Sequence, residues 1–129
     1  MAWMREVDRD RLRDELQGMM RSPVELSVSV AENEASVLAV EVLDEIASLS
    51  KEISLVRTAP HGLDPTIEVR GRNRGRVAFV GLPMGYEFPT LIDAVRDASL
   101  GRSSVAEEIR SEIAAIRSPR RIKVFTTPT

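Results

Sequence analysis

The chain has 129 residues, 43% of them apolar and 29% charged, with a net charge of −2. This is the composition of one globular domain, and its small charge gives no general attraction to nucleic acid or anionic membranes. It contains no cysteine, which excludes disulfides, thiolate metal sites and thiol nucleophiles.

No run of residues approaches the roughly 20 apolar residues of a membrane span. The N-terminus becomes charged at Arg5 and has no apolar stretch typical of a signal peptide. We therefore expect a cytoplasmic protein.

The first half of the chain predicts two helices and two strands. A helix is expected over residues 8–21, capped by Asp8, and a strand over residues 24–30, where Val and Leu alternate with polar residues. Asn33 opens a second helix that ends near Leu49, and residues 53–57 form the second strand. The apolar positions expected to be buried are Leu12, Leu16, Met19, Met20, Leu38, Val42, Leu43, Ile46 and Leu49.

The second half predicts a β-hairpin and two further helices. Residues 66–70 and 76–80 read as strands around a turn with Gly71 and Gly75 at its ends. Pro89 fits the first turn of a helix. Ser104 and Glu107 form a capping box for another helix, closed by Pro119. Val105, Ile109, Ile113 and Ile116 supply the expected core face of that helix, and residues 121–126 read as a final strand.

The order of elements predicts an α/β fold. A strand, helix and parallel strand followed by a hairpin and a covering helix is the thioredoxin order, with a mixed central sheet flanked by helices. We expect a leading helix in residues 1–22, a thioredoxin-like fold in residues 23–100, and a helix and strand in residues 101–129 that begin a second thioredoxin-like unit. A strand followed at once by a Thr-Pro turn suggests a piece of a longer protein.

Three segments carry a family resemblance. They are Pro23-Val24-Glu25-Leu26, Asp64-Pro65-Thr66 and Phe79-Val80-Gly81-Leu82-Pro83-Met84-Gly85-Tyr86-Glu87-Phe88. The sequence resembles the N-terminal tandem-thioredoxin domain of the flavoprotein component of alkyl hydroperoxide reductase, and also the glutaredoxin-like protein disulfide oxidoreductases. The resemblance implies two adjacent folds that share one sheet, with a redox Cys-x-x-Cys in the second fold.

Residues 31–38 occupy the place of a first-fold Cys-x-x-Cys and contain no cysteine. The flavoprotein reductases also lack cysteines in this fold, so they are the more similar group. Tyr86 departs from their Gly-His-Glu-Phe pattern, whereas Glu87 is retained.

The resemblance implies an auxiliary catalytic role for Glu87, whose counterpart lies near the cysteine pair of the neighbouring fold. A carboxylate there can accept a proton from a thiol or raise its pKa. Glu87 would act only with cysteines supplied downstream. The alternative is that Glu87 caps the helix that begins at Phe88.

The resemblance also implies a cis peptide before Pro65, which shapes a docking groove in thioredoxin folds. Pro65, Pro83 and Tyr86 are the residues we expect to dock a substrate or partner protein. Without cysteines, Pro65 is at most a ledge for a peptide.

Other motifs favour plain structural roles. Arg70, Arg72, Arg74 and Arg76 around the hairpin turn read as a solvated loop tip, with nucleic-acid binding as the alternative. His61 has no second histidine or cysteine for a metal site. A Ser-His-Asp arrangement drawn with Asp64 lacks a nucleophile motif.

The sequence therefore predicts a redox-inactive thioredoxin-fold module of a thiol-disulfide or peroxiredoxin reductase system, which supports a Cys-x-x-Cys fold and docks a redox partner. The chain alone is expected to have no activity and no metal or cofactor site. FAD and NADH enter only with a flavoprotein parent. The alternative is a free-standing protein-protein interaction module, with a homodimer formed through residues 121–129.

Overall fold

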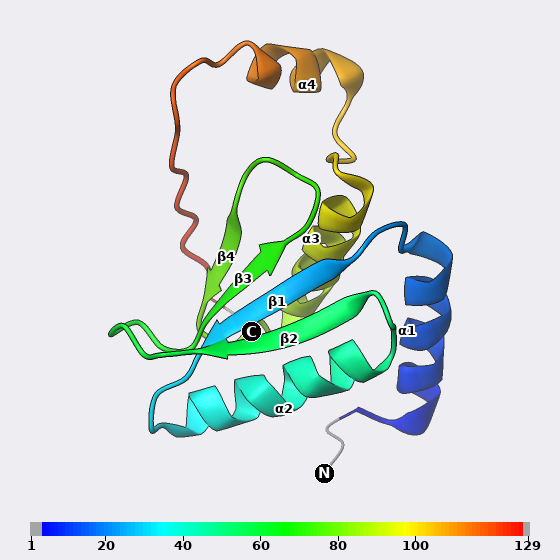
Figure 1. The fold of residues 1–129 in the computed structure, drawn as a ribbon, viewed down its shortest axis with the longest axis vertical. Helices are drawn as coiled ribbons and strands as arrows, with labels where there is room; N and C mark the ends of the chain where they lie inside the picture. Colours follow the sequence, from blue (N-terminus) through cyan, green and yellow to red (C-terminus); the bar gives the residue numbers. More distant parts are fainter. Residues whose placement is uncertain (1–3, 128–129) are drawn as a thin grey trace.

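A computed structural model describes residues 4–127. Its elements are α1 (Glu6–Met19), β1 (Val24–Ser29), α2 (Glu34–Ser48), β2 (Ile53–Thr58), β3 (Thr66–Arg70), β4 (Val77–Val80), the 3-10 helix η1 (Gly85–Glu87), α3 (Phe88–Leu100) and α4 (Glu107–Ala114). Figure 1 shows a central sheet with α2 and α3 packed along it and α4 standing away from it.

The sheet has the predicted mixed topology. Its strand order is β2-β1-β3-β4. β1 runs parallel to β2, as the α2 crossover requires, and antiparallel to β3, which pairs with β4 as a hairpin. The βαβ unit and the hairpin predicted from the sequence are confirmed.

One face of this sheet is buried, and the other is polar and open. Val24, Leu26 and Val28 of β1 are buried and lie in register with apolar residues of β2 and β3. The alternate positions, such as Glu25 and Ser54, are exposed. The helices therefore cover a single face, and the fold is a thioredoxin-like α/β sheet with one open side.

Two tethers fix α1 to this body. Arg9 pairs with Glu45 of α2, and the Glu45 side chain is only 9% exposed. At the other end, Ser99 Oγ of α3 accepts the Arg21 N–H at 2.7 Å and the Ser22 N–H at 3.0 Å. Leu12 and Leu16 of α1 join the core, so the leading helix is an integral layer.

Three local predictions are wrong. α1 begins at Glu6 without a side-chain cap, and Asp8 instead pairs with Arg5 at 2.7 Å. α4 begins at Glu107 with Ala106 at the N-cap and no side-chain cap, so Ser104 forms no capping box. Leu38 is 42% exposed, because it points to the surface of α2 while Ala39 takes the buried position.

The predicted final strand is also absent. Residues 121–127 have no regular secondary structure and no strand partner within the described part of the chain. A strand needs a neighbour for its backbone hydrogen bonds, and β4 pairs only with β3. The apolar face of α4 is exposed for the same reason, because no described element packs on it. Pro128 and Thr129 lie outside the described residues.

Candidate functional site

The peptide bond between Asp64 and Pro65 is cis, as predicted. The Pro65 side chain is fully buried, and its carbonyl accepts the Gly81 N–H at 2.8 Å. This bond places the loop after β4, which leads to Tyr86 and Glu87, beside the loop that enters β3. The structure therefore brings the predicted site residues to adjacent loops at one end of the hairpin.

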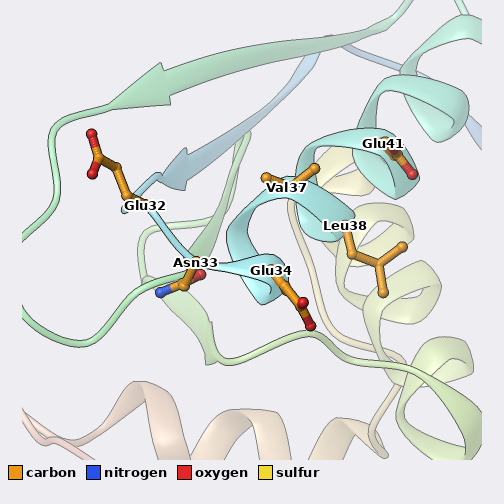
Figure 2. A pocket seen from close by; sticks show the side chains of 6 residues that line it. All are labelled: Glu32, Asn33, Glu34, Val37, Leu38 and Glu41. Carbon is orange, nitrogen blue, oxygen red and sulfur yellow. The ribbon is translucent and has the colours of Figure 1, made fainter.

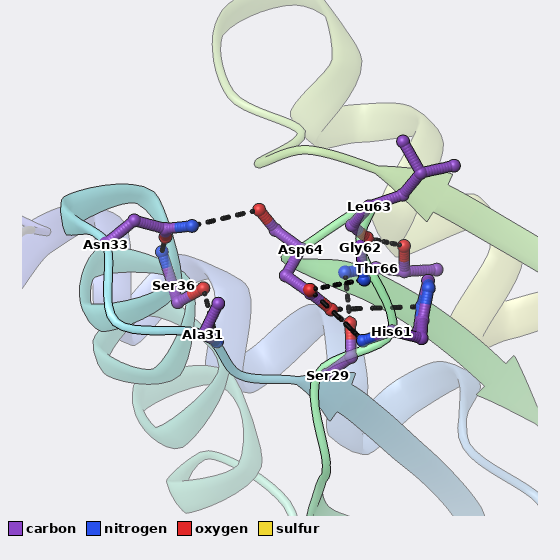
Figure 3. A network of polar contacts seen from close by, with 9 residues as sticks. All are labelled: Ser29, Ala31, Asn33, Ser36, His61, Gly62, Leu63, Asp64 and Thr66. Atoms are coloured by element: carbon purple, nitrogen blue, oxygen red, sulfur yellow. Dashed lines mark hydrogen bonds and ion pairs between the residues drawn. The ribbon is translucent and has the colours of Figure 1, made fainter.

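The Asp64 carboxylate organises the loop before Pro65. It accepts the Gly62 N–H at 2.9 Å and the His61 N–H at 3.2 Å (Figure 3). Ser29, buried at the end of β1, hydrogen-bonds the same carboxylate and also accepts the Thr66 N–H at 2.9 Å. One acidic side chain thus connects β1, the loop and the start of β3.

These contacts shift the acidity of Asp64. The Ser29 hydroxyl, followed by the Gly62 and His61 amides, holds the pKa of Asp64 below its ordinary value of 3.8, although desolvation opposes this shift. The carboxylate is therefore ionised at neutral pH.

Asn33 joins this loop to α2. Its Oδ1 accepts the Ser36 N–H at 2.7 Å as the predicted N-cap, and its Nδ2 donates to the Asp64 carbonyl at 3.3 Å. Residues 31–38 therefore hold a capped helix start where related folds carry a Cys-x-x-Cys, facing the loop before Pro65.

A surface hollow lies over this part of α2. It is lined by Glu32, Asn33, Glu34, Val37, Leu38 and Glu41 (Figure 2). Val37 and Leu38 form its apolar floor and carry no reactive group, so the hollow supports contact with another molecule better than catalysis.

Tyr86 and Glu87 lie in the 3-10 turn before α3. The Tyr86 side chain is 82% exposed, whereas Pro83 is buried. Glu87 occupies the N-cap of α3 but makes no side-chain cap bond, so the capping alternative is wrong in its hydrogen-bonded form. Instead, its Oε1 accepts a hydrogen bond from the Thr126 hydroxyl. The C-terminal segment therefore passes directly over Glu87.

The hairpin arginines are partly neutralised. Arg70 pairs with Glu68 at 2.7 Å, and Arg76 lies 3.7 Å from the same residue. The turn also packs on α3, because the Arg72 N–H donates to the Ala98 carbonyl at 2.8 Å. These contacts favour a structural role for the turn over a nucleic-acid interface.

His61 does not form a catalytic triad. Its Nε2 lies 3.9 Å from Asp64, but the Ser29 hydroxyl bonds to Asp64 itself and so cannot be activated by the histidine. Within residues 4–127, no group of three or more acidic, histidine or cysteine side chains is arranged to hold a metal ion. None of the helices in the same range has the length and apolar character needed to cross a bilayer.

Sequence reasoning missed the junction of Ser29, Asn33 and Asp64. Gly62 before an Asp-Pro pair was an available local signal, since Asp side chains often bind nearby backbone amides in turns. Ser29 and Asn33 are more than 30 residues away from Asp64 in the sequence, and only the fold brings them together.

The chain is similar in sequence to several reductases, although no family model matches it. It is 27% identical to the alkyl hydroperoxide reductase protein AhpF of Staphylococcus epidermidis over 98% of the chain and 25% of that protein. It is 30% identical to an NADH dehydrogenase of Bacillus subtilis over 76% of the chain and 19% of that protein. The chain thus spans about a quarter or less of the curated relatives it matches.

Solved structures share its fold. The alkyl hydroperoxide reductase protein AhpF of Enterococcus faecalis matches 90% of the chain with a TM-score of 0.74 and 21% identity, over 62% of that chain. A protein disulfide oxidoreductase from Aeropyrum pernix matches 89% with a TM-score of 0.75 and 18% identity, over 56% of that chain. The fold is thioredoxin-like, and sequence and fold together make the chain a relative of the N-terminal domain of AhpF.

Proposed function

We propose that this chain is the redox-inactive first thioredoxin fold of a thiol-disulfide or peroxiredoxin reductase system. It supports a second fold that carries Cys-x-x-Cys and helps to form the surface that docks a partner thiol protein. Similarity to AhpF over 98% of the chain supports this assignment. Because the thiolate is the nucleophile in disulfide exchange and the chain has no cysteine, it has no such activity alone.

The observation that carries the proposal is the unburied apolar surface of residues 105–125. Val105, Ile109, Ile113 and Ile116 are 40–56% exposed, and Ile122, Val124 and Phe125 are 78–92% exposed. In Figure 1 these residues belong to α4 and to the segment that returns from it toward the strands. Contiguous exposed apolar surface marks an interaction site, and a second fold following this segment would cover it.

The contact between Thr126 and Glu87 supports the auxiliary role of Glu87. Groups that follow residue 127 would leave the segment close to this carboxylate. Glu87 would then exchange a proton with a thiol of the second fold.

The docking surface would consist of the two loops joined through Pro65 and Gly81. Tyr86, Val80 and Leu63 are 62–82% exposed on or beside these loops. Tyr86 would supply contact area to the partner, while the buried Pro65 and Pro83 shape the backbone beneath it.

We assign no cofactor site to this chain. FAD and NADH would be bound by other parts of a longer flavoprotein of the kind that it resembles, and we expect the system to be cytoplasmic.

The test is a fusion in which the Cys-x-x-Cys fold of the S. epidermidis relative follows Thr129. We expect residues 105–125 to gain amide hydrogen-exchange protection in the fusion, and the fusion, unlike the chain alone, to reduce insulin disulfides. A control fusion carrying Ile109→Asp and Ile113→Asp should lose the protection. Identical exchange of residues 105–125 in the chain and the fusion would overturn the supporting role.

The same exposed segment favours one alternative, a free-standing assembly module that forms a homodimer through its C-terminal residues. An unpaired apolar segment beside the open edge of β4 invites pairing between chains. Light scattering of the whole chain, and of a variant lacking residues 121–129, separates the two cases. A dimer that disappears on truncation supports the alternative, and a monomer at all concentrations overturns it.

A further inference from the structure

The loop between β2 and β3 combines an exposed tip with a buried acidic base. The Leu63 side chain is 62% exposed at the tip, and the His61 side chain is 52% exposed beside it. The Asp64 side chain, one residue later, is only 5% exposed. An apolar side chain is therefore presented to solvent by a segment fixed from below.

Three groups bind the carboxylate at this base. The Gly62 and His61 amides and the Ser29 hydroxyl all direct hydrogen bonds to it (Figure 3). Bonds to an ionised acceptor are about twice as strong as neutral ones. Gly62 has a φ of +108°, which a residue with a side chain rarely adopts. The loop is thus held in a conformation that depends on this one carboxylate.

The same residue is tied to its surroundings through its backbone. Asn33 of α2 donates to the Asp64 carbonyl at 3.3 Å, and the Thr66 hydroxyl donates to the Leu63 carbonyl. Ser29 also accepts the Thr66 N–H. Asp64 is therefore the junction at which the loop meets β1, β3 and α2.

We propose that the ionised Asp64 carboxylate is a latch that holds residues 60–64 in one conformation and thereby fixes the Leu63 side chain at the surface. Protonation replaces an acceptor by an O–H donor, so the carboxyl group no longer satisfies the three donors equally. The loop is then released while the sheet below remains. This role goes beyond the proposed reductase function and does not depend on it.

The direction of the pH dependence follows from the surrounding groups. β1 and β3 present the neutral Ser29 hydroxyl and the Thr66 amide, and α2 presents the neutral Asn33 amide. Among the described residues, His61 is the charged group that acts on Asp64, and its protonated form favours the carboxylate. Since the pKa of Asp64 is lowered on folding, the latch is complete above the ordinary carboxyl pKa and is lost as pH falls through the lower folded value.

NMR of the whole chain tests the latch directly. We expect the Asp64 carboxyl carbon to titrate below 3.8, with the His61 and Gly62 amide shifts following the same midpoint. In Asp64→Asn, amide exchange at Gly62 should accelerate roughly tenfold or more at constant pH, as expected for loss of hydrogen bonds to a charged group. Asp14→Asn, which removes an exposed carboxylate from α1, should leave Gly62 unchanged.

Ser29→Ala provides a second test if the Asp64 variant does not fold. Loss of the hydroxyl should raise the midpoint of Asp64 toward its ordinary value and speed exchange at Gly62. The proposal is overturned if Asp64 titrates without any response at His61 and Gly62, or if a folded Asp64→Asn variant retains wild-type exchange in the loop.

Discussion

Residues 24–100 and residues 101–127 have similar apolar patterns but opposite environments. Leu43 and Ile46 of α2 are fully buried beneath the sheet, whereas Ile109 and Ile113 of α4 are 48% and 56% exposed. Both pairs lie on helices with an apolar stripe. The difference shows that a stripe is buried only when a partner surface exists, and α2 has β1 and β2 while α4 has none among the described elements.

The largest effect is expected from truncating the two stripes. Leu43→Ala should lower the free energy of unfolding by about 2–5 kcal/mol, because it leaves a cavity in a fully packed core. The matched Ile113→Ala change should alter it by less than about 0.5 kcal/mol. Urea denaturation of both variants measures the difference, and equal losses would mean that α4 packs on the body in solution.

The hairpin turn offers a second comparison, between its two glycines. A Cβ at Gly71 would lie 2.4 Å from the Ala98 carbonyl oxygen, whereas a Cβ at Gly75 meets no atom within 4 Å. Gly71→Ala should therefore cost about 1–3 kcal/mol of stability through overpacking against α3. Thermal unfolding should show Gly75→Ala close to wild type, and a tolerated Gly71→Ala would refute the close packing of the turn.

Serines at the two ends of the body differ in the same way. Ser99 is fully buried and bonds to the backbone of Arg21 and Ser22, whereas Ser103 is exposed. Ser99→Ala should cost about 1–2 kcal/mol, because buried backbone groups lose their partner. Denaturation of Ser103→Ala supplies the control, which we expect to be unchanged within about 0.5 kcal/mol.

The smallest effect is expected at Glu87. Glu87→Gln weakens a solvent-exposed contact with Thr126, so its effect on global stability should be below about 0.5 kcal/mol. The amide signals of residues 121–127 should nevertheless shift, and NMR spectra of the two proteins would show this. Spectra that coincide there would mean that the segment does not rest on Glu87.

The sequence predicted the body well because each of its elements carries a local signal. Alternation in residues 24–30, the Asn33 cap and the glycine-bounded turn each specify one element, and the crossover fixes how they pair. The final strand was wrong because the apolar sequence of residues 121–126 reports a tendency toward burial but not a neighbour to bury against. Leu38 and Ile113 were misplaced for the same physical reason.

The candidate site was only partly predictable. The motif led to Pro65, Pro83, Tyr86 and Glu87, and the structure brings their loops together, yet it does not test their roles. The Asp64 junction depends on Ser29 and Asn33, whose approach is set by the sheet register and by the start of α2. Such contacts between distant segments leave no periodic pattern in a sequence.

The bonds between Ser22 and Ser99 have one more consequence. Ser22 Oγ donates to the Ser99 carbonyl at 2.5 Å, and Ser99 Oγ donates to the Ser22 carbonyl at 2.9 Å. The entrance to β1 and the exit from α3 therefore adjoin, as they do in domains that tolerate circular permutation or insertion into a host protein. Residues 23–98 could be carried as a guest in a surface loop of another protein, with both connections leaving from one point.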